Sequence, residues 1–177
     1  MPDKNYIPKY TYSDYEKWQG NWELIYGAPV AMSPSPKRKH QVIEKKLIQS
    51  FLVDNKDKQE NCDCEIYHGL DWKIDAQTVL RPDLMIVCGV FNTDFLEFPP
   101  LLVVEIASDS TRLLDRNTKF GIYEQNGVKF YIIADPSNQT IETFQLINNV
   151  YSSIDTNVFE LNQKCTITLN FKDLFSN

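Results

Sequence analysis

Local patterns in the N-terminal part of the chain predict a short helix followed by a hairpin. Residues 11–18 start with Thr, Ser and Asp side chains that can cap a helix. Residues 21–32 contain two short apolar runs separated by Gly27, a pattern typical of a β-hairpin. The Ser-Pro-Ser-Pro run at 33–36 breaks any regular element.

A helical period begins at His40. Ile43, Leu47 and Phe51 recur every four residues and give one apolar face, which predicts an amphipathic helix. The polar stretch 54–63 should form a loop. Cap-forming residues at 108–111 and a stop at Asn126-Gly127 bound a second predicted helix.

Strand-like segments fill most of the remaining chain. They comprise residues 65–67, 80–87, 101–106, 128–134, 141–146, 150–151 and 165–169. Segments 80–87 and 101–106 are apolar on both faces, as expected of central strands covered by helices, and 128–134 is a third central strand. The last three segments should be peripheral or antiparallel. We therefore predict one α/β domain spanning residues 1–177.

Composition places the protein among ordinary globular chains. Its 177 residues are 42% hydrophobic and 24% charged. No apolar stretch approaches the roughly 20 residues that a membrane helix needs. The N-terminus is polar and lacks the apolar segment of a signal peptide, so we expect a cytoplasmic protein without a membrane partner.

The charge distribution gives mixed indications about nucleic acid. The net charge of −6 argues against an extended phosphate-binding surface. Basic residues nevertheless gather at Lys37-Arg38-Lys39, at Lys45-Lys46, and at Arg112, Arg116 and Lys119. A solvated loop and helix face is the favoured explanation of the first cluster. We assign Arg112 and Arg116 as candidate phosphate-binding residues.

The four cysteines do not match the usual spacing of a zinc site. Cys62 and Cys64 form a C-x-C pair, followed by His68, while Cys88 and Cys165 lie in apolar strand contexts. Zinc sites normally use a C-x₂₋₄-C pair with a second ligand pair. We therefore expect four reduced thiols and a surface histidine.

Two lone acids in apolar strand segments are the strongest functional signal. Asp83 lies within the segment 80–87, and Glu105 within 101–106. Burying a single carboxylate there is costly unless it binds a cation or joins a strong hydrogen-bond network. Carboxylates are hard ligands suited to Mg²⁺ or Mn²⁺. Structural explanations also exist: Asp83 could end a strand after Pro82, and Glu105 could pair with an arginine such as Arg112.

Lys119 would add a positive charge to such a site. It lies on the predicted helix after the second acid. Asp115 precedes it by four residues, so an ion pair along the helix explains Lys119 without any catalytic role. The joint occurrence of Asp83, Glu105 and Lys119 favours metal-assisted phosphodiester cleavage.

The order of these motifs resembles the Uma-type family of putative restriction endonucleases, in the PD-(D/E)XK nuclease-like superfamily. The resemblance covers about residues 10–175 and rests on Glu23 to Gly27, His40-Gln41, Arg81-Pro82-Asp83, Val104 to Ser108, Asp115-Arg116-x-x-Lys119, and Gly127-Val128 to Asp135-Pro136. It implies a restriction-endonuclease-like mixed sheet flanked by helices, with an N-terminal hairpin, additional C-terminal antiparallel strands and a divalent-metal site.

The resemblance also assigns roles to individual residues. Asp83 and Glu105 correspond to the two acids of the superfamily and would bind Mg²⁺ or Mn²⁺, with the Ile106 carbonyl as a further ligand. The superfamily lysine should follow the second acid by two residues, where this chain has Ala107. The Uma-type family resembles nucleases whose lysine lies on the next helix, and Lys119 matches that position.

Two further residues receive auxiliary roles. Glu23 would be a third acid near the metal. His40 would contact phosphate or water, although it could equally cap the helix that it begins.

Three functions are consistent with this sequence. The first is a Mg²⁺-dependent endonuclease acting on DNA, for which we expect a homodimer because two sites related by symmetry can cut two strands. The second is an inactive descendant that serves as a binding or assembly module, which the acidic charge and Ala107 favour. The third is a metal-dependent phosphodiesterase acting on a small nucleotide.

Overall fold

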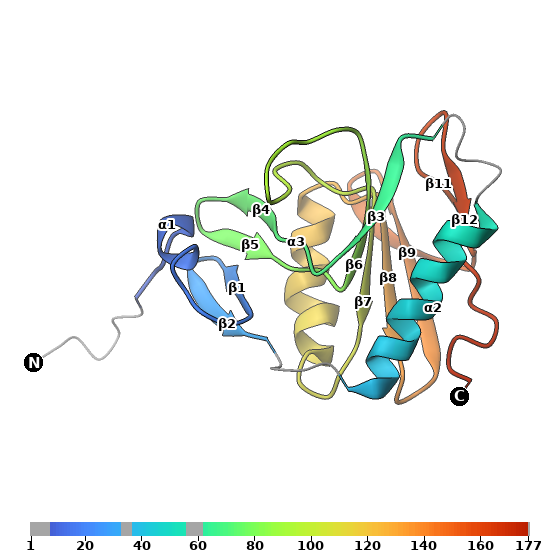
Figure 1. The fold of residues 1–177 in the computed structure, drawn as a ribbon, viewed down its shortest axis with the longest axis horizontal. Helices are drawn as coiled ribbons and strands as arrows, with labels where there is room; N and C mark the ends of the chain where they lie inside the picture. Colours follow the sequence, from blue (N-terminus) through green and yellow to red (C-terminus); the bar gives the residue numbers. More distant parts are fainter. Residues whose placement is uncertain (1–7, 33–36, 56–61, 177) are drawn as a thin grey trace, which may run out of the picture.

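A six-stranded mixed sheet forms the body of the protein. The computed structural model describes residues 8–32, 37–55 and 62–176, so the predicted break at 33–36 and much of the predicted loop at 54–63 lie outside the described residues. The strand order is β10-β9-β8-β7-β6-β3, built from β10 (Val150–Ile154), β9 (Thr140–Ile147), β8 (Phe130–Asp135), β7 (Leu102–Ile106), β6 (Leu84–Cys88) and β3 (Cys64–His68) (Figure 1). Only β7 and β8 pair in parallel among these strands as described.

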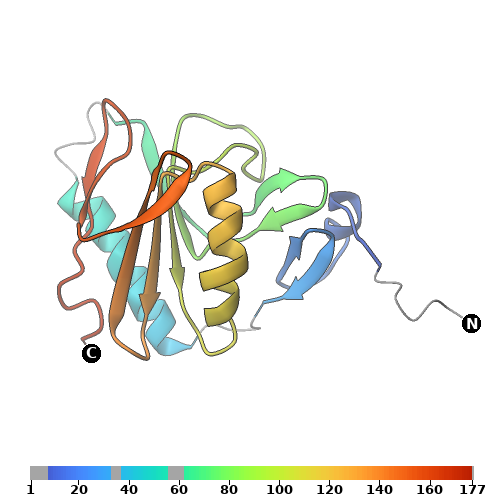
Figure 2. The same ribbon diagram turned by 180° about the vertical axis from the view of Figure 1, so that it is seen from behind.

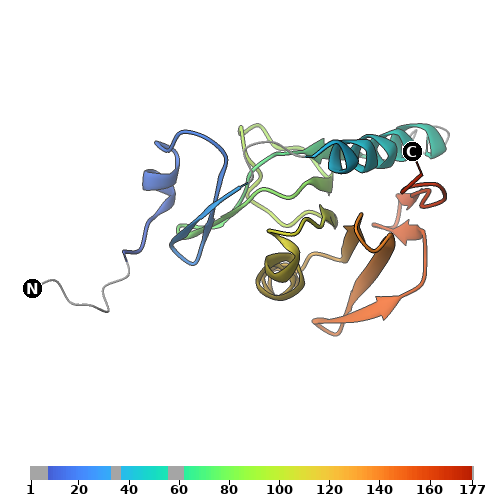
Figure 3. The ribbon, with the colours of Figure 1, turned by 90° about the horizontal axis from the view of Figure 1, so that it is seen from below.

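Helices cover the two faces of this sheet. Helix α2 (Arg38–Asp54) buries Ile43, Leu47 and Phe51 against one face, as the four-residue period predicts. The opposite face packs on a helical crossover between β7 and β8, in which a π-helical segment, η2 (Leu114–Lys119), continues into α3 (Phe120–Gln125). Viewed along the sheet edge, α2 and α3 lie on opposite sides of the strands (Figure 3).

The N-terminal hairpin and residues 72–80 form a second, smaller sheet beside the first. It has the order β2-β1-β5-β4, with β1 (Trp22–Ile25), β2 (Ala28–Ala31), β4 (Trp72–Asp75) and β5 (Thr78–Leu80). Helix α1 (Tyr12–Tyr15) has a capping box between Thr11 and Asp14 and packs Tyr15 on this sheet. Tyr26 and Gly27 both have positive φ, as expected of a tight hairpin turn at this position. Figure 2 shows this unit projecting from the main sheet.

The predicted fold class is therefore confirmed, with corrections to individual strands. The segment 80–87 is not one strand: it breaks at Arg81-Pro82-Asp83, so that β5 joins the small sheet and β6 the large one. Proline lacks the N–H that a continuous ladder needs, which explains the break. The sequence patterns also missed β4 and β11 (Val158–Glu160), which pairs with β12 (Thr166–Thr168).

The prediction of four reduced cysteines is wrong for this structure. Cys62 is bonded to Cys165, and Cys64 to Cys88. The two partners of each bond come from segments 103 and 24 residues apart, respectively, so the pairing depends on tertiary contacts that spacing does not reveal. The Cys62–Cys165 bond joins the segment before β3 to the ribbon formed by β11 and β12, whereas Cys64–Cys88 links β3 to β6 within the large sheet.

Candidate active site

The register of two neighbouring strands brings Asp83 and Glu105 together. In the antiparallel pair β6–β7, Leu84 is opposite Val104, so the residue before Leu84 falls beside the residue after Val104. Asp83 is fixed there because its Oδ2 accepts a hydrogen bond from the Ile106 backbone N–H over 2.7 Å. The two acids that are 22 positions apart in sequence thus belong to one end of adjacent central strands.

Strand alternation decides which face Glu105 uses. Val103 and Ala107 pack in the cluster beneath α3, while Leu102, Val104 and Ile106 pack beneath α2. Glu105 therefore points toward the helical crossover, where its side chain is buried. Ala107 shares this face, as predicted, and supplies no charge to it.

Lys119 supplies the positive charge instead. It is buried at the end of the π-helical segment, with Nζ 3.0 Å from Glu105 Oε1 and 2.8 Å from Glu23 Oε1. Asp115 Oδ1 is farther away, at 4.0 Å. The ion pair along the helix exists, but the carboxylates from two different strands contact Lys119 more closely. Single-turn π-helical segments are frequent at functional sites.

Glu23 enters the site from the small sheet. It is 2% exposed on β1, and its Oε1 accepts a hydrogen bond from the Arg81 backbone N–H over 2.8 Å. The break between β5 and β6 therefore joins the two sheets. The Arg81 backbone is hydrogen-bonded to Glu23 of the small sheet, and the Asp83 side chain, two residues later, is hydrogen-bonded to β7 of the large sheet. Glu23, Glu105 and Lys119 consequently form one buried cluster.

His40 contacts the other oxygen of Asp83. Its Nε2 lies 3.1 Å from Asp83 Oδ1, in the first turn of α2. Burial lowers the pKa of His40, but the hydrogen bond and negative charge of Asp83 outweigh it and raise the pKa above the ordinary value. The helix-cap alternative does not apply, because Lys37 occupies the cap position.

The electrostatics of the cluster show an excess of negative charge. Burial raises the pKa of Glu105 well above its ordinary value; Lys119 opposes this effect, and neighbouring carboxylates reinforce it. Burial likewise raises the pKa of Asp115 to about 6. Burial would lower the pKa of Lys119, yet the surrounding acids raise it, so the lysine is protonated at neutral pH.

These side chains line one cleft of about 750 Å³. Its wall includes all five predicted residues of the catalytic and auxiliary set, namely Glu23, His40, Asp83, Glu105 and Lys119. Lys37 and Lys39, from the predicted basic cluster, also line it. The cleft therefore combines buried acids with basic residues at the start of α2.

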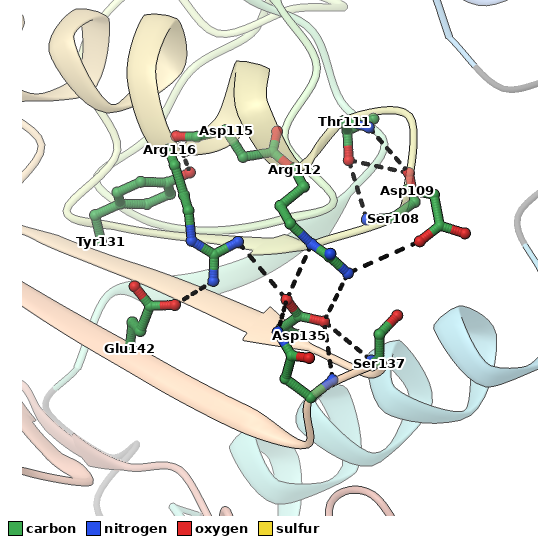
Figure 4. Close-up of polar contacts among 11 residues, drawn as sticks. Ser108, Asp109, Thr111, Arg112, Asp115, Arg116, Tyr131, Asp135, Ser137 and Glu142 are labelled. Atoms are coloured by element: carbon green, nitrogen blue, oxygen red, sulfur yellow. Dashed lines mark hydrogen bonds and ion pairs between the residues drawn. The ribbon is translucent and has the colours of Figure 1, made fainter.

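Arg112 and Arg116 are not among the residues that line this cleft. Both guanidinium groups point toward Asp135, which is fully buried at the end of β8 (Figure 4). Arg112 Nε lies 3.2 Å from Asp135 Oδ2, and Arg116 also pairs with Glu142 on β9. Arg112 therefore pairs with Asp135, and not with Glu105 as the structural alternative had suggested. A phosphate-binding role for the two arginines remains a prediction.

Sequence reasoning did not assign two residues that complete the cluster. The Tyr123 hydroxyl donates a hydrogen bond to Glu105 Oε1 over 2.5 Å. Tyr123 lies on α3, four residues after Lys119, and this spacing was the sequence signal that could have placed it on the same helix face as Lys119. Asp115 was considered only as a helical partner of Lys119. Its Oδ1 is buried and has no hydrogen-bond partner among the described residues.

The fold and this set of side chains define a nuclease-like protein. Residues 12–173 match the Uma2 family, described as putative restriction endonucleases, and the chain belongs to this family. An uncharacterized protein of Synechocystis, slr1290, is 29% identical over 149 residues, covering 78% of this chain and 75% of the relative. A solved structure of a putative nuclease belonging to DUF820 from Anabaena variabilis has the same fold, with a TM-score of 0.73 at 17% identity over 94% of this chain and 97% of that one.

No helix that the structure describes is both long enough and apolar enough to cross a bilayer.

Proposed function

We propose that this protein is a divalent-metal-dependent endonuclease that hydrolyses DNA phosphodiester bonds. The observation that carries the proposal is the contact of Lys119 with Glu105, in a cleft that Asp83 also lines. Membership in the restriction endonuclease family supports the same reaction class. Lys119, on the helical crossover, supplies the positive charge that Ala107 does not provide on the strand.

The donor set of the cleft fits a divalent cation such as Mg²⁺ or Mn²⁺. Asp83 and Glu105 would hold it, with Glu23 nearby, because hard cations prefer carboxylate oxygens. Burial first, and then neighbouring carboxylates, raise the pKa of Glu105 against the opposing charge of Lys119, so a bound cation would stabilise its ionised form. Asp115 Oδ1, which has no hydrogen-bond partner among the described residues and lies 4.0 Å from Lys119 Nζ, adds a further acid to this cluster. A bound divalent cation would polarise a phosphoryl oxygen and lower the pKa of a water ligand.

Lys119 and His40 have separate tasks in this proposal. Because its pKa is raised, Lys119 acts as a positive charge and hydrogen-bond donor toward the attacked phosphate or the attacking water. His40 holds one oxygen of Asp83, and the Ile106 N–H holds the other, so the orientation of this carboxylate is fixed.

DNA is the proposed substrate because basic residues line the same cleft as the acids. Lys37 and Lys39 would contact phosphates flanking the reacting one. Arg112 and Arg116 would add contacts beyond the cleft through the parts of their side chains that remain exposed, about a third and a quarter respectively. Two copies acting on opposite strands would cut both of them.

The test is a plasmid-cleavage assay with Mg²⁺ or Mn²⁺, comparing the native protein with Asp83→Asn. We expect nicking or linearisation that EDTA abolishes and that the variant loses. Asp94→Asn is the matched control, because Asp94 is exposed and away from the cleft, and it should cleave normally. Cleavage that persists in purified Asp83→Asn would contradict the proposal.

A second measurement separates the alternative functions. Titration calorimetry with Mn²⁺ should detect binding to the native protein and a loss of affinity in Asp83→Asn. Absence of both Mn²⁺ binding and cleavage would indicate a binding or assembly module. Hydrolysis of a dinucleotide but not of plasmid would indicate a small-nucleotide phosphodiesterase.

A further inference from the structure

All four cysteines of the chain meet at one place, far from the candidate active site along the strands. Cys62 precedes β3, Cys64 begins it, Cys88 ends β6, and Cys165 precedes β12. Cys88 ends the five-residue strand β6 and Asp83 immediately precedes it, so roughly 16 Å of extended chain separates them. The cysteines therefore form a site independent of the cleft.

The sulfur atoms converge more closely than two separate disulfides require. The Sγ atoms of Cys62, Cys64 and Cys165 all lie within 4.8 Å of one another, although Cys64 is bonded to neither of the other two. Cys88 is bonded to Cys64 and thus completes a group of four. Four thiolates around a zinc ion, with Zn–S bonds of about 2.3 Å, place their sulfur atoms about 3.8 Å apart.

The surroundings of Cys64 suit a thiolate. Its Cα lies 3.9 Å from that of Cys88, directly opposite in the β3–β6 ladder, whereas disulfides usually join Cα atoms about 4.4–6.8 Å apart. The Asn162 amide donates to Cys64 Sγ over 3.8 Å, and the same side chain accepts from the Cys165 backbone N–H. Such hydrogen bonds orient and stabilise metal-bound sulfur.

We propose that, in the reduced protein, Cys62, Cys64, Cys88 and Cys165 bind one zinc ion. Reduction of the two disulfides takes four electrons. A dithiol supplies them together with four protons and is oxidised to its disulfide, whereas a phosphine becomes the phosphine oxide and water supplies the oxygen and the protons. The resulting thiols release four protons when they coordinate zinc as thiolates. With all four positions filled by protein, the site is structural: it fastens the β11–β12 ribbon to β3 and β6.

A cleft beside the cysteines offers a path for the ion. It has a volume of about 740 Å³ and is lined by Cys62, Cys64, Phe91 and residues at the C-terminal end of α2. Cys62 and Cys88 are partly exposed, while Cys64 and Cys165 are buried. The site is therefore reachable from solvent through two of its ligands.

The test is metal and thiol analysis of the full chain, purified anaerobically with a phosphine reductant and without chelator. We expect about one zinc per chain and four thiols that alkylate only after denaturation with EDTA. Replacement by Co²⁺ should give the intense visible and thiolate-to-cobalt absorption bands of a tetrahedral sulfur site, a measurement that needs no variant. Cys88→Ser should lose the zinc.

A matched variant separates this site from the acid cluster. Asp83→Asn should keep its zinc, whatever its effect on DNA cleavage. Four free thiols without zinc, or two disulfides that resist the reductant in the folded protein, would overturn the proposal. Zinc that is lost in Asp83→Asn but retained in Cys88→Ser would overturn it as well.

Discussion

Lys119 Nζ lies 3.0 Å from Glu105 Oε1, although the two residues belong to a helix and a strand. The contact puts an ammonium group where the strand itself has only Ala107, and it is buried, with both side chains at most 4% exposed. Glu23 Oε1, 2.8 Å from the same ammonium, joins the small sheet to this pair. Removal of Glu23, Glu105 or Lys119 would therefore leave a buried charge with one of its ion-pair partners missing.

Replacement of Lys119 by methionine should reduce cleavage by about 10²–10⁴-fold, the range expected for loss of one positioned charge or proton donor. Initial rates of plasmid nicking at saturating Mg²⁺ measure the effect, and circular dichroism checks the fold. Lys17→Met removes an exposed lysine outside the cleft and should cleave as the native protein does. Equal rates for both variants would exclude a catalytic role for Lys119.

Replacement of Tyr123 by phenylalanine should shift the acidic limb of the activity profile to higher pH. The Tyr123 hydroxyl donates to Glu105 Oε1, and a hydrogen bond to the ionised form of an acid lowers its pKa. Its loss therefore raises the pKa of Glu105 further. Tyr151→Phe is the control, because that buried hydroxyl donates to the Val128 carbonyl instead. A parallel shift in both variants would indicate a general effect on packing.

The His40–Asp83 pair should stabilise the metal-free protein most at low pH. Because the pKa of folded His40 is raised above its ordinary 6.5, the contribution is fully present below that pH and is lost as pH rises through the folded pKa. The Tm deficit of His40→Asn in EDTA should thus shrink as the pH rises above 6.5. A Tm deficit that stays the same as the pH rises would contradict this coupling.

Asp115 should destabilise the metal-free protein as the pH rises. Burial raises its pKa from 3.8 to about 6, so the folded state binds a proton more tightly than the unfolded chain does. The resulting contribution is present below about pH 4 and is lost as pH rises through about 6. In EDTA, the Tm of Asp115→Asn relative to the native protein should therefore increase from about pH 4 to 7. A difference that is constant with pH would contradict the assignment.

The sequence by itself determined the long helix, the central strands and the two acids. The four-residue period of Ile43, Leu47 and Phe51 required a helix with one buried face, and the apolar runs around Val103 and Ile132 required central strands. A lone carboxylate in such a run is costly, so Asp83 and Glu105 stood out without any structure. Motif order then identified the family and pointed to Lys119.

Tertiary structure decided everything that depends on contacts between distant segments. Because the chain breaks at Pro82, β5 pairs in the small sheet and β6 in the large one. The small sheet thereby lies against the large one, with Glu23 beside Lys119. The pairing of Arg112 with Asp135, and the convergence of the cysteines, likewise join residues that no local pattern relates. Periodicity reports which face of an element is buried, whereas the partner of a buried charge is set by how elements pack against one another.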